Sequence, residues 1–328
     1  MSNHAACIVG LGAYLPERVL TNIDLCKIVD TTDEWITART GIKQRHIADP
    51  DQATSDLAAE AATRALQGAT IAPESIDMIL VATFTPDAMT PSTASRVQKQ
   101  IGAVNAAVLD IEAACSGFVY GLVIAQQFIE TGTMKNILVI GADTVTRYLD
   151  WKDRNTCVLF GDGAGAAVVS RAECGSRLLG YHLGADGAAP REWLMLIGSG
   201  SAGRLAGVQR QMETHLTMNG KAIFTFGVEI LPKLIATVLQ KSHLELDEID
   251  LIIPHQANKR MIQSTAESMG LPIEKFYMNI DLCANTSAAS IPIAMVDACS
   301  EDRLRHGDML LLAGFGGGLT WGGIALEF

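Results

Sequence analysis

A weak internal repeat is the feature of this sequence that most constrains its fold. Residues 65–80 align with residues 238–253 at an offset of 173, and both segments read as a helix end, a short loop and a buried strand. Residues 136–141 align with residues 308–313 at an offset of 172. Apolar strands that begin with Ile-Asp are common, so chance can produce one such match. Two matches at nearly one offset favour two halves of similar fold.

Continuous apolar runs alternate with helical stretches along most of the chain. Strands without a polar side belong to sheets covered on both faces, which is typical of α/β proteins. The boundary is expected near residues 171–176, so that residues 1–172 form one half and residues 173–328 the other. The predicted strands are 6–9, 78–81, 137–140, 166–169, 251–253, 309–312 and 323–326, and predicted helices include 54–66, 91–100 and 228–240.

Charge and cysteine content argue against several classes of function. The formal net charge is −11 without any basic tract, so nucleic-acid binding is not expected. The seven cysteines are scattered singly with no C-x-x-C pair, which argues against a disulfide framework or a structural metal site and for a reducing compartment. No signal-peptide pattern and no uninterrupted membrane-span-length apolar stretch is present. We therefore expect a cytoplasmic location.

Cys115 opens an apolar run that continues to Gly132. The run is apolar on every side, so it is predicted to be a buried helix with the cysteine in its first turn. Unpaired N–H groups and the positive end of the helix dipole favour a thiolate there, and the thiolate is the nucleophile. A buried cysteine that only packs is the alternative, since most free cysteines do so.

His255 and Asn285 are the other candidates for catalysis. His255 follows the predicted strand 251–253, and α/β folds place their chemistry at the carboxyl ends of strands. By the repeat, the segment that leads into Asn285 corresponds to the one that leads into Cys115, so the two residues would begin equivalent helices that converge. Taken singly, His255 can be a structural histidine and Asn285 a helix N-cap.

The order Cys, His, Asn also occurs in papain-like peptidases. The Cys-Gly-Ser-Cys-Trp context of those enzymes is missing here, however, and the chain is a duplicated α/β protein. A peptidase is therefore disfavoured.

Six motifs in order along the whole chain carry a resemblance to a known family. The sequence resembles the thiolase-fold condensing enzymes, and specifically β-ketoacyl-acyl-carrier-protein synthase III. The resemblance implies an α/β thiolase-like fold whose duplicated halves form a five-layered αβαβα arrangement, and Cys-His-Asn, in place of Cys-His-His, is typical of this branch. The motifs are residues 32–36 with 39–42 (TDEWI and RTGI), 114–118 (ACSGF), 160–166 (FGDGAGA), 254–258 (PHQAN), 285–290 (NTSAAS) and 314–322 (GFGGGLTWG).

The resemblance implies an acyltransferase that performs a decarboxylating Claisen condensation in fatty acid biosynthesis. Cys115 would take an acyl group from acyl-CoA, and malonyl-acyl carrier protein would then lose carbon dioxide and attack the acyl-cysteine. His255 and Asn285 would donate hydrogen bonds to the enolate oxygen. The backbone N–H groups of Cys115 and Gly317 would form the oxyanion hole. Coenzyme A enters as the thioester substrate, so no cofactor or metal is expected.

The resemblance also implies binding residues and a symmetric homodimer. The coenzyme A site would comprise Trp35, Arg39, Thr40, Arg154 and Asn258. Lys259 and Arg260 would form a basic spot for acidic acyl carrier protein, although a solvated helix face is the alternative. Thr90 would reach across the dimer as the gate of the partner's acyl pocket.

Departures from the family pattern surround Asn285. Ala284 occupies a position that is usually glycine, and Leu282 and Cys283 replace more polar residues. A related synthase of secondary metabolism, with another primer or acyl acceptor, is thus a second hypothesis. A catalytically idle partner subunit is a third, against which the intact Cys115, His255 and Asn285 argue.

Overall fold

The computed structural model describes residues 5–172, 177–190, 193–197 and 215–328. A five-stranded sheet lies in the N-terminal part of the chain, with the strand order β1-β7-β6-β4-β5. β4 pairs parallel with β5 and β6, whereas β7 pairs antiparallel with β6 and β1. The strands are β1 (Ala5–Tyr14), β4 (Met78–Ala82), β5 (Ala107–Ile111), β6 (Asn136–Asp143) and β7 (Gly163–Ala172).

A second sheet repeats this topology with later strands, in the order β8-β13-β12-β11. β11 and β12 are parallel, and β13 is antiparallel to both of its neighbours, as β7 is in the first sheet. An isolated parallel bridge from Ile252 to Phe276 stands where β5 would. The shared topology is what the sequence repeat predicted. The strands are β8 (Arg177–Ala185), β11 (Leu251–Pro254), β12 (Met309–Gly316) and β13 (Thr320–Glu327).

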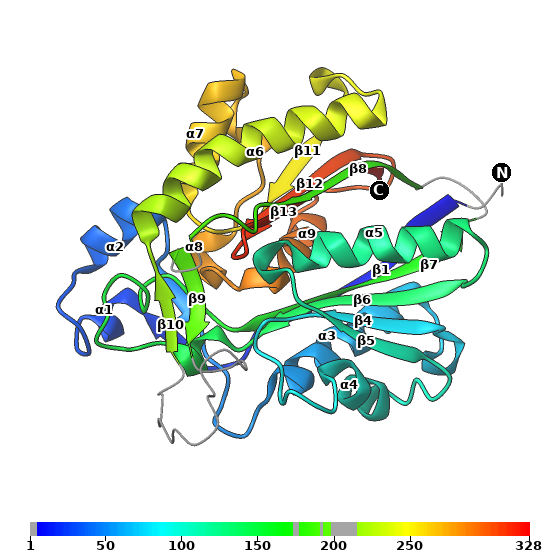
Figure 1. Ribbon diagram of the computed structural model, residues 1–328, viewed down its shortest axis with the longest axis horizontal. Helices are drawn as coiled ribbons and strands as arrows, with labels where there is room; N and C mark the ends of the chain where they lie inside the picture. The colour runs from blue at the N-terminus through cyan, green and yellow to red at the C-terminus, as the bar shows by residue number, and fades with distance from the viewer. Residues whose placement is uncertain (1–4, 173–176, 191–192, 198–214) are drawn as a thin grey trace.

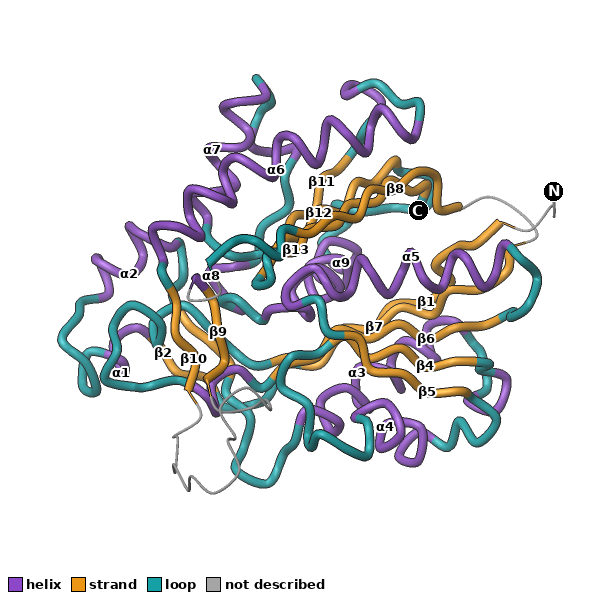
Figure 2. Tube along the Cα trace, in the orientation of Figure 1, coloured by secondary structure: helices purple, strands orange, loops and turns teal. Residues whose placement is uncertain are grey.

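Helices complete five layers, which Figures 1 and 2 show from the side. α5 and α9 lie between the sheets, α3 and α4 cover the outer face of the first sheet, and α6 covers the second with α7 beside it. One apolar core joins both sheets through α5, whose Phe118 and Leu122 are fully buried. The helices are α3 (Thr54–Ala69), α4 (Thr93–Ile101), α5 (Gly117–Glu130), α6 (Gly220–Ser242), α7 (Lys259–Met269) and α9 (Ser290–Ser300).

Shorter elements flank one end of the two sheets and carry part of the candidate site. α2 is capped by the Thr32 side chain, which accepts a hydrogen bond from the backbone N–H of Trp35 at 3.1 Å, and it ends at Gly41 with φ +83°. These elements are α1 (Asn22–Leu25), α2 (Asp33–Thr40), α8 (Ile280–Cys283), β2 (Val19–Thr21), β3 (Gln44–His46), β9 (Leu194–Ile197) and β10 (His215–Met218).

The predicted elements coincide with observed ones, and their ends differ. α4 begins two residues after the predicted start, and α6 begins eight residues before it. β5 was not predicted because it is an edge strand with alternating half-exposed positions, not a continuous buried run. The proposed boundary between residues 172 and 173 stays a prediction, since residues 173–176 lie outside the described residues.

Among the described residues, one helix, α6, is long and apolar enough to cross a membrane by length and composition alone. Glu229, Pro232 and Lys233 interrupt its apolar sequence. Leu231, Leu234 and Val238 are buried in the core that α6 forms with the second sheet. The helix therefore serves as the outer layer of the fold.

Candidate active site

Cys115 lies in a 3₁₀ turn, Ala114–Ser116, that leads directly into α5. Its side chain is buried, with 5% exposure. The end of β12 presses against it, because a Cβ atom on Gly316 would lie 2.6 Å from the Cys115 backbone nitrogen. Only glycine permits so close an approach of the backbone, which explains the first glycine of the run 316–318.

Burial raises the pKa of the Cys115 thiol to about 12. The Ser287 hydroxyl lowers this pKa, and the charge of Asp143 raises it further. The expectation that the helix end would hold a thiolate at rest is therefore wrong for this conformation. Cys115 precedes the helix in a separate turn, and desolvation of the charged form outweighs the helix dipole. The resting group is a thiol that must give up a proton to react.

His255 lies directly after β11, and its imidazole ring is 2% exposed. Its Nδ1 lies 2.7 Å from Ser290 Oγ, and the Phe315 ring packs edge-on at 5.6 Å between centroids. Burial lowers the pKa of His255 to about 3, so the ring is neutral at physiological pH. Ser290 Oγ also accepts from the Gln256 N–H at 3.4 Å, which favours its own hydrogen pointing to Nδ1. With the Ser290 hydroxyl as donor to Nδ1, we assign the proton of the neutral ring to Nε2, which is then the atom available as a donor.

Asn285 is held by the backbone on both sides. Its N–H donates to the Leu159 carbonyl at 3.0 Å, and its carbonyl accepts from the Gly161 N–H at 3.0 Å. Its side-chain Oδ1 accepts from the Ser287 N–H at 2.8 Å, which orients the amide. The NH₂ group is thereby left for a ligand. Asn285 can therefore accept the Ser287 N–H through Oδ1, as a helix cap would, and still donate through its NH₂ group.

The segment before Asn285 adopts an unusual backbone. Ala284 has φ 57° and ψ −161°, a region that is essentially restricted to glycine and is strained for other residues. The two residues before it differ in exposure: Leu282 is 51% exposed, whereas Cys283 is buried. The alanine in place of the family's glycine therefore stores strain directly beside Asn285.

The two turns that carry the catalytic candidates meet between the sheets. The 3₁₀ turn Ala114–Ser116 packs against the 3₁₀ turn Ser287–Ala289, which leads into α9, and against β12. The turn Ala114–Ser116 leads into α5 as the turn Ser287–Ala289 leads into α9, so the two halves contribute equivalent elements to the site, as the repeat implied.

A cavity of about 830 Å³ extends from α2 to Asn285. Cys115 and His255 do not line it and are buried in this conformation. Trp35, Arg39, Thr40, Arg154, Asn258 and Arg260 all line this cavity, so the predicted coenzyme A residues share it with Asn285.

Two guanidinium groups contact the indole ring of Trp35. Arg39 and Arg154 each place their Cζ atom 4.9 Å from the centroid of the indole ring, and Arg154 Nη1 donates to the Asp30 carbonyl at 3.0 Å. Such cation–π contacts stabilise the cluster. A planar ligand between Trp35 and Arg154 would need a spacing of about 7 Å, two van der Waals contacts. Arg154 must therefore move if a ring is to insert there.

Two other predicted ligands already use their polar atoms within the protein. The Thr40 hydroxyl donates to the Ile36 carbonyl at 2.7 Å and accepts from the Ile42 N–H at 3.0 Å. Asn258 is the N-cap of α7: its Oδ1 accepts from the Arg260 N–H at 2.9 Å and its Nδ2 donates to the Arg39 carbonyl at 3.1 Å. Thr40 thus fixes the end of α2, and Asn258 links the start of α7 to α2.

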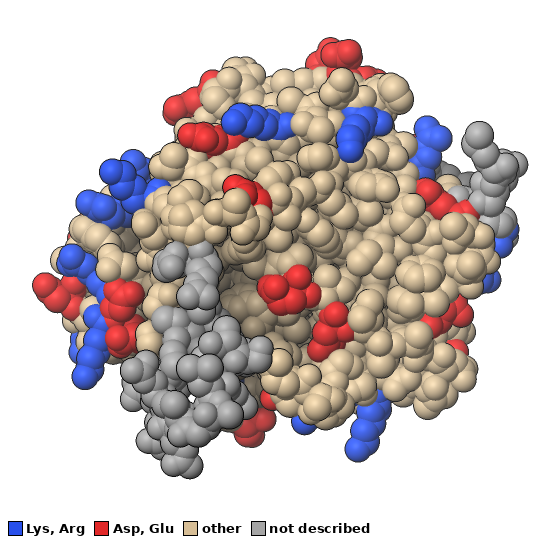
Figure 3. Space-filling view, viewed as in Figure 1, with Lys and Arg blue, Asp and Glu red and all other residues tan. Residues whose placement is uncertain are grey.

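Lys259 and Arg260 are exposed in the first turn of α7. The Lys259 stem packs on Gly41, where a Cβ would lie 2.6 Å from Lys259 Cβ, and Arg260 lies 5.6 Å from the Phe224 ring centroid. On the face that Figure 3 shows, acidic and basic side chains are mixed along the edge where α1 and α2 lie.

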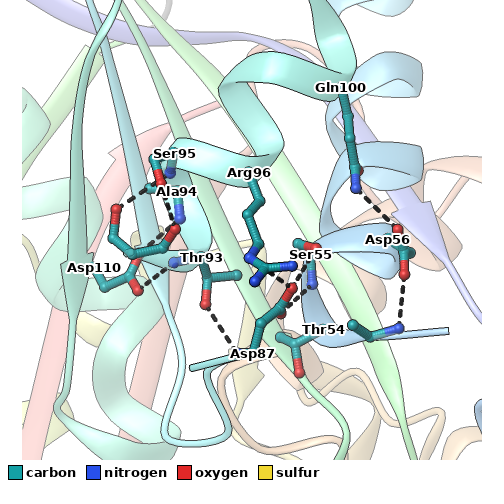
Figure 4. A network of polar contacts seen from close by, with 12 residues as sticks. Thr54, Ser55, Asp56, Asp87, Thr93, Ala94, Ser95, Arg96, Gln100 and Asp110 are labelled. Carbon is teal, nitrogen blue, oxygen red and sulfur yellow. Dashed lines mark hydrogen bonds and ion pairs between the residues drawn. The ribbon is translucent and has the colours of Figure 1, made fainter. Parts of the chain in front are cut away.

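Thr90 is exposed in the loop between β4 and α4 and does not line the cavity of its own chain. Both ends of this loop are anchored (Figure 4). Asp87 accepts from the N–H and hydroxyl of Ser55 at 2.9 and 2.6 Å, and Asp110 accepts from the N–H groups of Thr93 and Ala94 at 2.7 and 2.8 Å. Hydrogen bonds thus fix both ends of the loop that carries the exposed Thr90.

Sequence reasoning missed three residues around the candidate nucleophile and histidine: Asp143, Ser287 and Ser290. Asp143 ends the buried strand β6, which is the same signal that singled out His255. Ser287 and Ser290 belong to a recognised motif but carry no pattern that distinguishes them from helix-start serines. Among the described residues, no group of three or more metal-ligating side chains is placed to hold a metal ion.

The duplicated five-layered fold, with these residues between its halves, defines a thiolase-fold condensing enzyme, an acyltransferase. Sequence models of 3-oxoacyl-[acyl-carrier-protein] synthase III and of its C-terminal region match residues 109–187 and 239–328. The chain belongs to the β-ketoacyl-[acyl-carrier-protein] synthase III family.

Relatives match over nearly the whole chain. The synthase III of Caldanaerobacter subterraneus subsp. tengcongensis is 51% identical over 99% of this chain and 98% of its own. The crystal structure of synthase III from Aquifex aeolicus VF5 superposes with a TM-score of 0.92 at 45% identity, covering 98% of this chain and all of that one. The priming β-ketosynthase from the R1128 polyketide pathway has a TM-score of 0.92 at 33% identity, covering 98% of this chain and 96% of its own.

Proposed function

We propose that this enzyme joins an acyl-CoA primer to malonyl-acyl carrier protein and so initiates fatty acid synthesis. In the first half reaction Cys115 attacks the thioester, and coenzyme A leaves. In the second, malonyl-acyl carrier protein loses carbon dioxide, and the enolate displaces Cys115 to form a 3-ketoacyl product. The observation that carries the proposal is the meeting of the Cys115 and Asn285 turns between the two sheets, beside β12.

His255 and Asn285 are assigned the enolate oxygen. A neutral imidazole with its proton on Nε2 and an oriented amide NH₂ are both donors at physiological pH. Neither carries charge, so each stabilises the developing negative oxygen without pairing with the malonyl carboxylate beforehand. The buried, lowered-pKa state of His255 supports this role and argues against a general base.

The oxyanion hole of the acyl-cysteine is assigned to the backbone N–H groups of Cys115 and Gly317. The closeness of the Gly316 backbone to the Cys115 nitrogen supports this pairing. Two N–H donors on rigid backbone need no reorganisation when the tetrahedral oxygen forms.

Coenzyme A is assigned to the cavity that ends at Asn285. Its adenine would insert beside Trp35 after Arg154 swings away, and Arg39 would face phosphate. Thr40 and Asn258 would shape the wall around the pantetheine arm, with Asn258 offering only the capacity left by its two existing bonds. Arg260, exposed at the cavity, and Lys259 would meet the acidic carrier protein.

Intact-protein mass spectrometry tests the proposed function. The enzyme is mixed with a panel of acyl-CoAs and then with malonyl-acyl carrier protein. We expect one acyl adduct with acetyl-CoA or a short branched primer, followed by discharge to a 3-ketoacyl carrier protein. An adduct formed only with long or unusual acyl groups, or one that malonyl-carrier protein fails to discharge, would instead support a synthase of secondary metabolism. The strained Ala284 beside Asn285 is the observation that keeps this second candidate.

A homodimer is part of the proposal. β5 is an edge strand of the first sheet, and an unpaired edge is a template for pairing with another chain. Exposed apolar side chains lie on and around it: Leu109 is 48% exposed, Val104 is 73% and Met89 is 78%. Pairing of two such edges would bury them and carry Thr90 toward the partner's acyl pocket.

Substitution at this edge tests the dimer. Light scattering of the unmodified protein at micromolar concentration should give twice the chain mass, and Leu109→Asp should give a monomer, because two carboxylates cannot be buried at the pairing edge. Ile23→Asp is the matched control, since Ile23 is also an exposed apolar residue (64%) but lies on α1, outside the first sheet. A monomeric unmodified protein would refute the dimer. We also propose a cytoplasmic location, because an exposed free cysteine such as Cys26 persists best in a reducing compartment.

A further inference from the structure

The two N–H groups assigned to the oxyanion hole come from opposite halves of the chain. Cys115 lies in the 3₁₀ turn before α5, whereas Gly317 lies in the turn that joins β12 to β13. A tetrahedral oxygen can accept from both groups only if they point toward one place. The packing of Gly316 on the Cys115 nitrogen brings the two turns together, but it does not set the direction of each N–H. The turns therefore need a polar link that fixes their relative orientation.

Thr320 opens β13 and reaches both turns with one hydroxyl group. It pairs with Gly316 in the antiparallel register of β12 and β13. Its Oγ1 lies 2.9 Å from the carbonyl oxygen of Ala113, which leads into the nucleophile turn. The same Oγ1 lies 3.1 Å from the carbonyl oxygen of Gly317. Since both carbonyls are acceptors, the Thr320 hydroxyl is the donor in either contact. One side chain thus spans the segments that carry the two oxyanion donors.

The hydroxyl of Ser116 joins this contact from the nucleophile turn. Ser116 is fully buried, and its Oγ lies 2.7 Å from the Ala113 carbonyl oxygen and 2.9 Å from Thr320 Oγ1. The backbone N–H of Ser116 also donates to the Ala113 carbonyl, at 3.2 Å. Ser116 and Thr320, the hydroxyl pair, therefore share their two protons among contacts that connect the turn before α5 with the turn after β12.

The peptide group between Ala113 and Ala114 is held at both ends. Its carbonyl contacts the hydroxyl pair, and its N–H donates to Glu112 Oε1 at 3.1 Å. The next peptide group carries the Cys115 N–H, and the torsion angles of Ala114 relate the two groups. Ala114 has a φ of 44°, in the left-handed region that alanine rarely adopts. The direction of the Cys115 N–H thus depends on a peptide group that the hydroxyl pair fixes.

We propose that Thr320 is a positioning residue that aligns the N–H groups of Cys115 and Gly317 on the tetrahedral oxygen. Ser116 is its partner in the hydroxyl pair. The tetrahedral oxygen forms when Cys115 attacks the acyl-CoA, and it forms again when the enolate attacks the acyl-cysteine. Preorganised donors lower the barrier of both attacks, because they need no rotation as the charge develops.

The same geometry leaves the remaining parts of the reaction independent of the hydroxyl pair. Loss of carbon dioxide from the malonyl group places charge on the enolate oxygen, which is assigned to His255 and Asn285. Thr320 does not line the coenzyme A cavity. A defect in the hydroxyl pair should therefore slow acyl transfer and spare both decarboxylation and the KM for acyl-CoA.

This inference rests on the proposed function, so its test includes probes that do not need the natural substrates. p-Nitrophenyl acetate acetylates Cys115 through a tetrahedral intermediate, whereas iodoacetamide alkylates it without one. Thr320→Val removes the hydroxyl and keeps the branched shape of the side chain. We expect acylation by p-nitrophenyl acetate and by acyl-CoA each to slow about tenfold, less than the roughly 10²- to 10³-fold cost of deleting a donor. Alkylation by iodoacetamide should be unchanged.

Two further variants separate the hydroxyl from the bulk of the side chain and from general destabilisation. Thr320→Ser keeps the hydroxyl and should restore most of the acylation rate. Thr265→Val is the matched control, because Thr265 is also buried and its hydroxyl also donates to a backbone carbonyl, that of Met261 at 2.9 Å in α7. It should leave acylation, alkylation and decarboxylation unchanged.

Slower acylation by both donors, with normal alkylation and normal release of carbon dioxide from malonyl-acyl carrier protein without primer, is the result expected of Thr320→Val. Equal slowing of alkylation would show that the cysteine itself is displaced and would overturn the inference. Normal acylation in Thr320→Val, or no recovery in Thr320→Ser, would overturn it as well.

Should Thr320→Val fail to fold, Ser116→Ala decides, because it removes the other hydroxyl of the pair. It should slow acylation severalfold without a change in alkylation, and normal acylation would reject the inference. Failure of the proposed function has a different signature: the unmodified enzyme would form no adduct with any acyl-CoA. Acetylation of Cys115 by p-nitrophenyl acetate would then still measure the effect of the hydroxyl pair.

Discussion

Cys115→Ser should abolish formation of the acyl-enzyme and reduce overall condensation by at least about 10³-fold, as removal of a covalent nucleophile does elsewhere. A hydroxyl is a far weaker nucleophile than a thiol at neutral pH. It would lie in the same buried position, pressed by Gly316 and 5% exposed, without help from a strong base. The measurement is the intact mass after incubation with the primer acyl-CoA, together with the rate of 3-ketoacyl carrier protein formation.

The control is Cys157→Ala, because Cys157 is a second fully buried cysteine that packs in the small core beside α2 and α8. It should retain the adduct and most of the turnover in spite of some loss of stability. A normal acyl adduct in Cys115→Ser would contradict the nucleophile assignment. An adduct lost equally in Cys157→Ala would point to instability of the fold.

Asn285→Ala should impair malonyl decarboxylation by about 10²- to 10³-fold, the usual cost of one preorganised donor to a developing oxyanion. Acylation of Cys115 should stay within a few fold, because the amide NH₂ is assigned to the enolate and not to the primer carbonyl. Asn285→Asp is the sharper variant: it keeps the shape and the Oδ1 that accepts from the Ser287 N–H, and it replaces the donor with an acceptor. Release of carbon dioxide from malonyl-acyl carrier protein and the mass of acyl-Cys115 measure the two steps separately.

Asn279→Ala provides the matched control for this second experiment. Asn279 is also a buried asparagine, 4% exposed and bonded to Asp297 Oδ2 at 2.7 Å, and it lies outside the lining of the cavity. It should leave the ratio of decarboxylation to acylation unchanged. Equal losses of both steps in Asn285→Ala would contradict the separate roles given to Asn285 and Cys115.

Much of the fold followed from local patterns. The strands β4, β6 and β12 are buried on both faces, so each is a continuous apolar run that can be recognised in the sequence. The repeat predicted that the second sheet would copy the first, and the matching strand orders agree with it. β5 was not predicted, because an edge strand exposes alternate side chains and so lacks a continuous apolar run. The starts of α4 and α6 shifted because caps and tertiary packing set helix ends.

The sequence identified candidate catalytic residues but not the ionisation state of the cysteine. Cys115 and His255 stood out by their positions at the ends of apolar runs. The ionisation of Cys115 was predicted wrongly, because a helix end is a local feature, whereas burial by β12 and the charge of Asp143 come from elsewhere in the chain.

The sequence by itself determined the alternation of strands and helices, the duplication and the chemical groups available, because periodicity and residue type are local properties. Only the tertiary structure decided which groups meet. Asp143 belongs to the first half and Ser287 to the second, and no spacing along the chain predicts that both shift the pKa of the Cys115 thiol. The arrangement of Arg154 on Trp35 likewise follows from packing between distant segments. Contacts of this kind set the pKa of each buried group, and so the chemistry of the site.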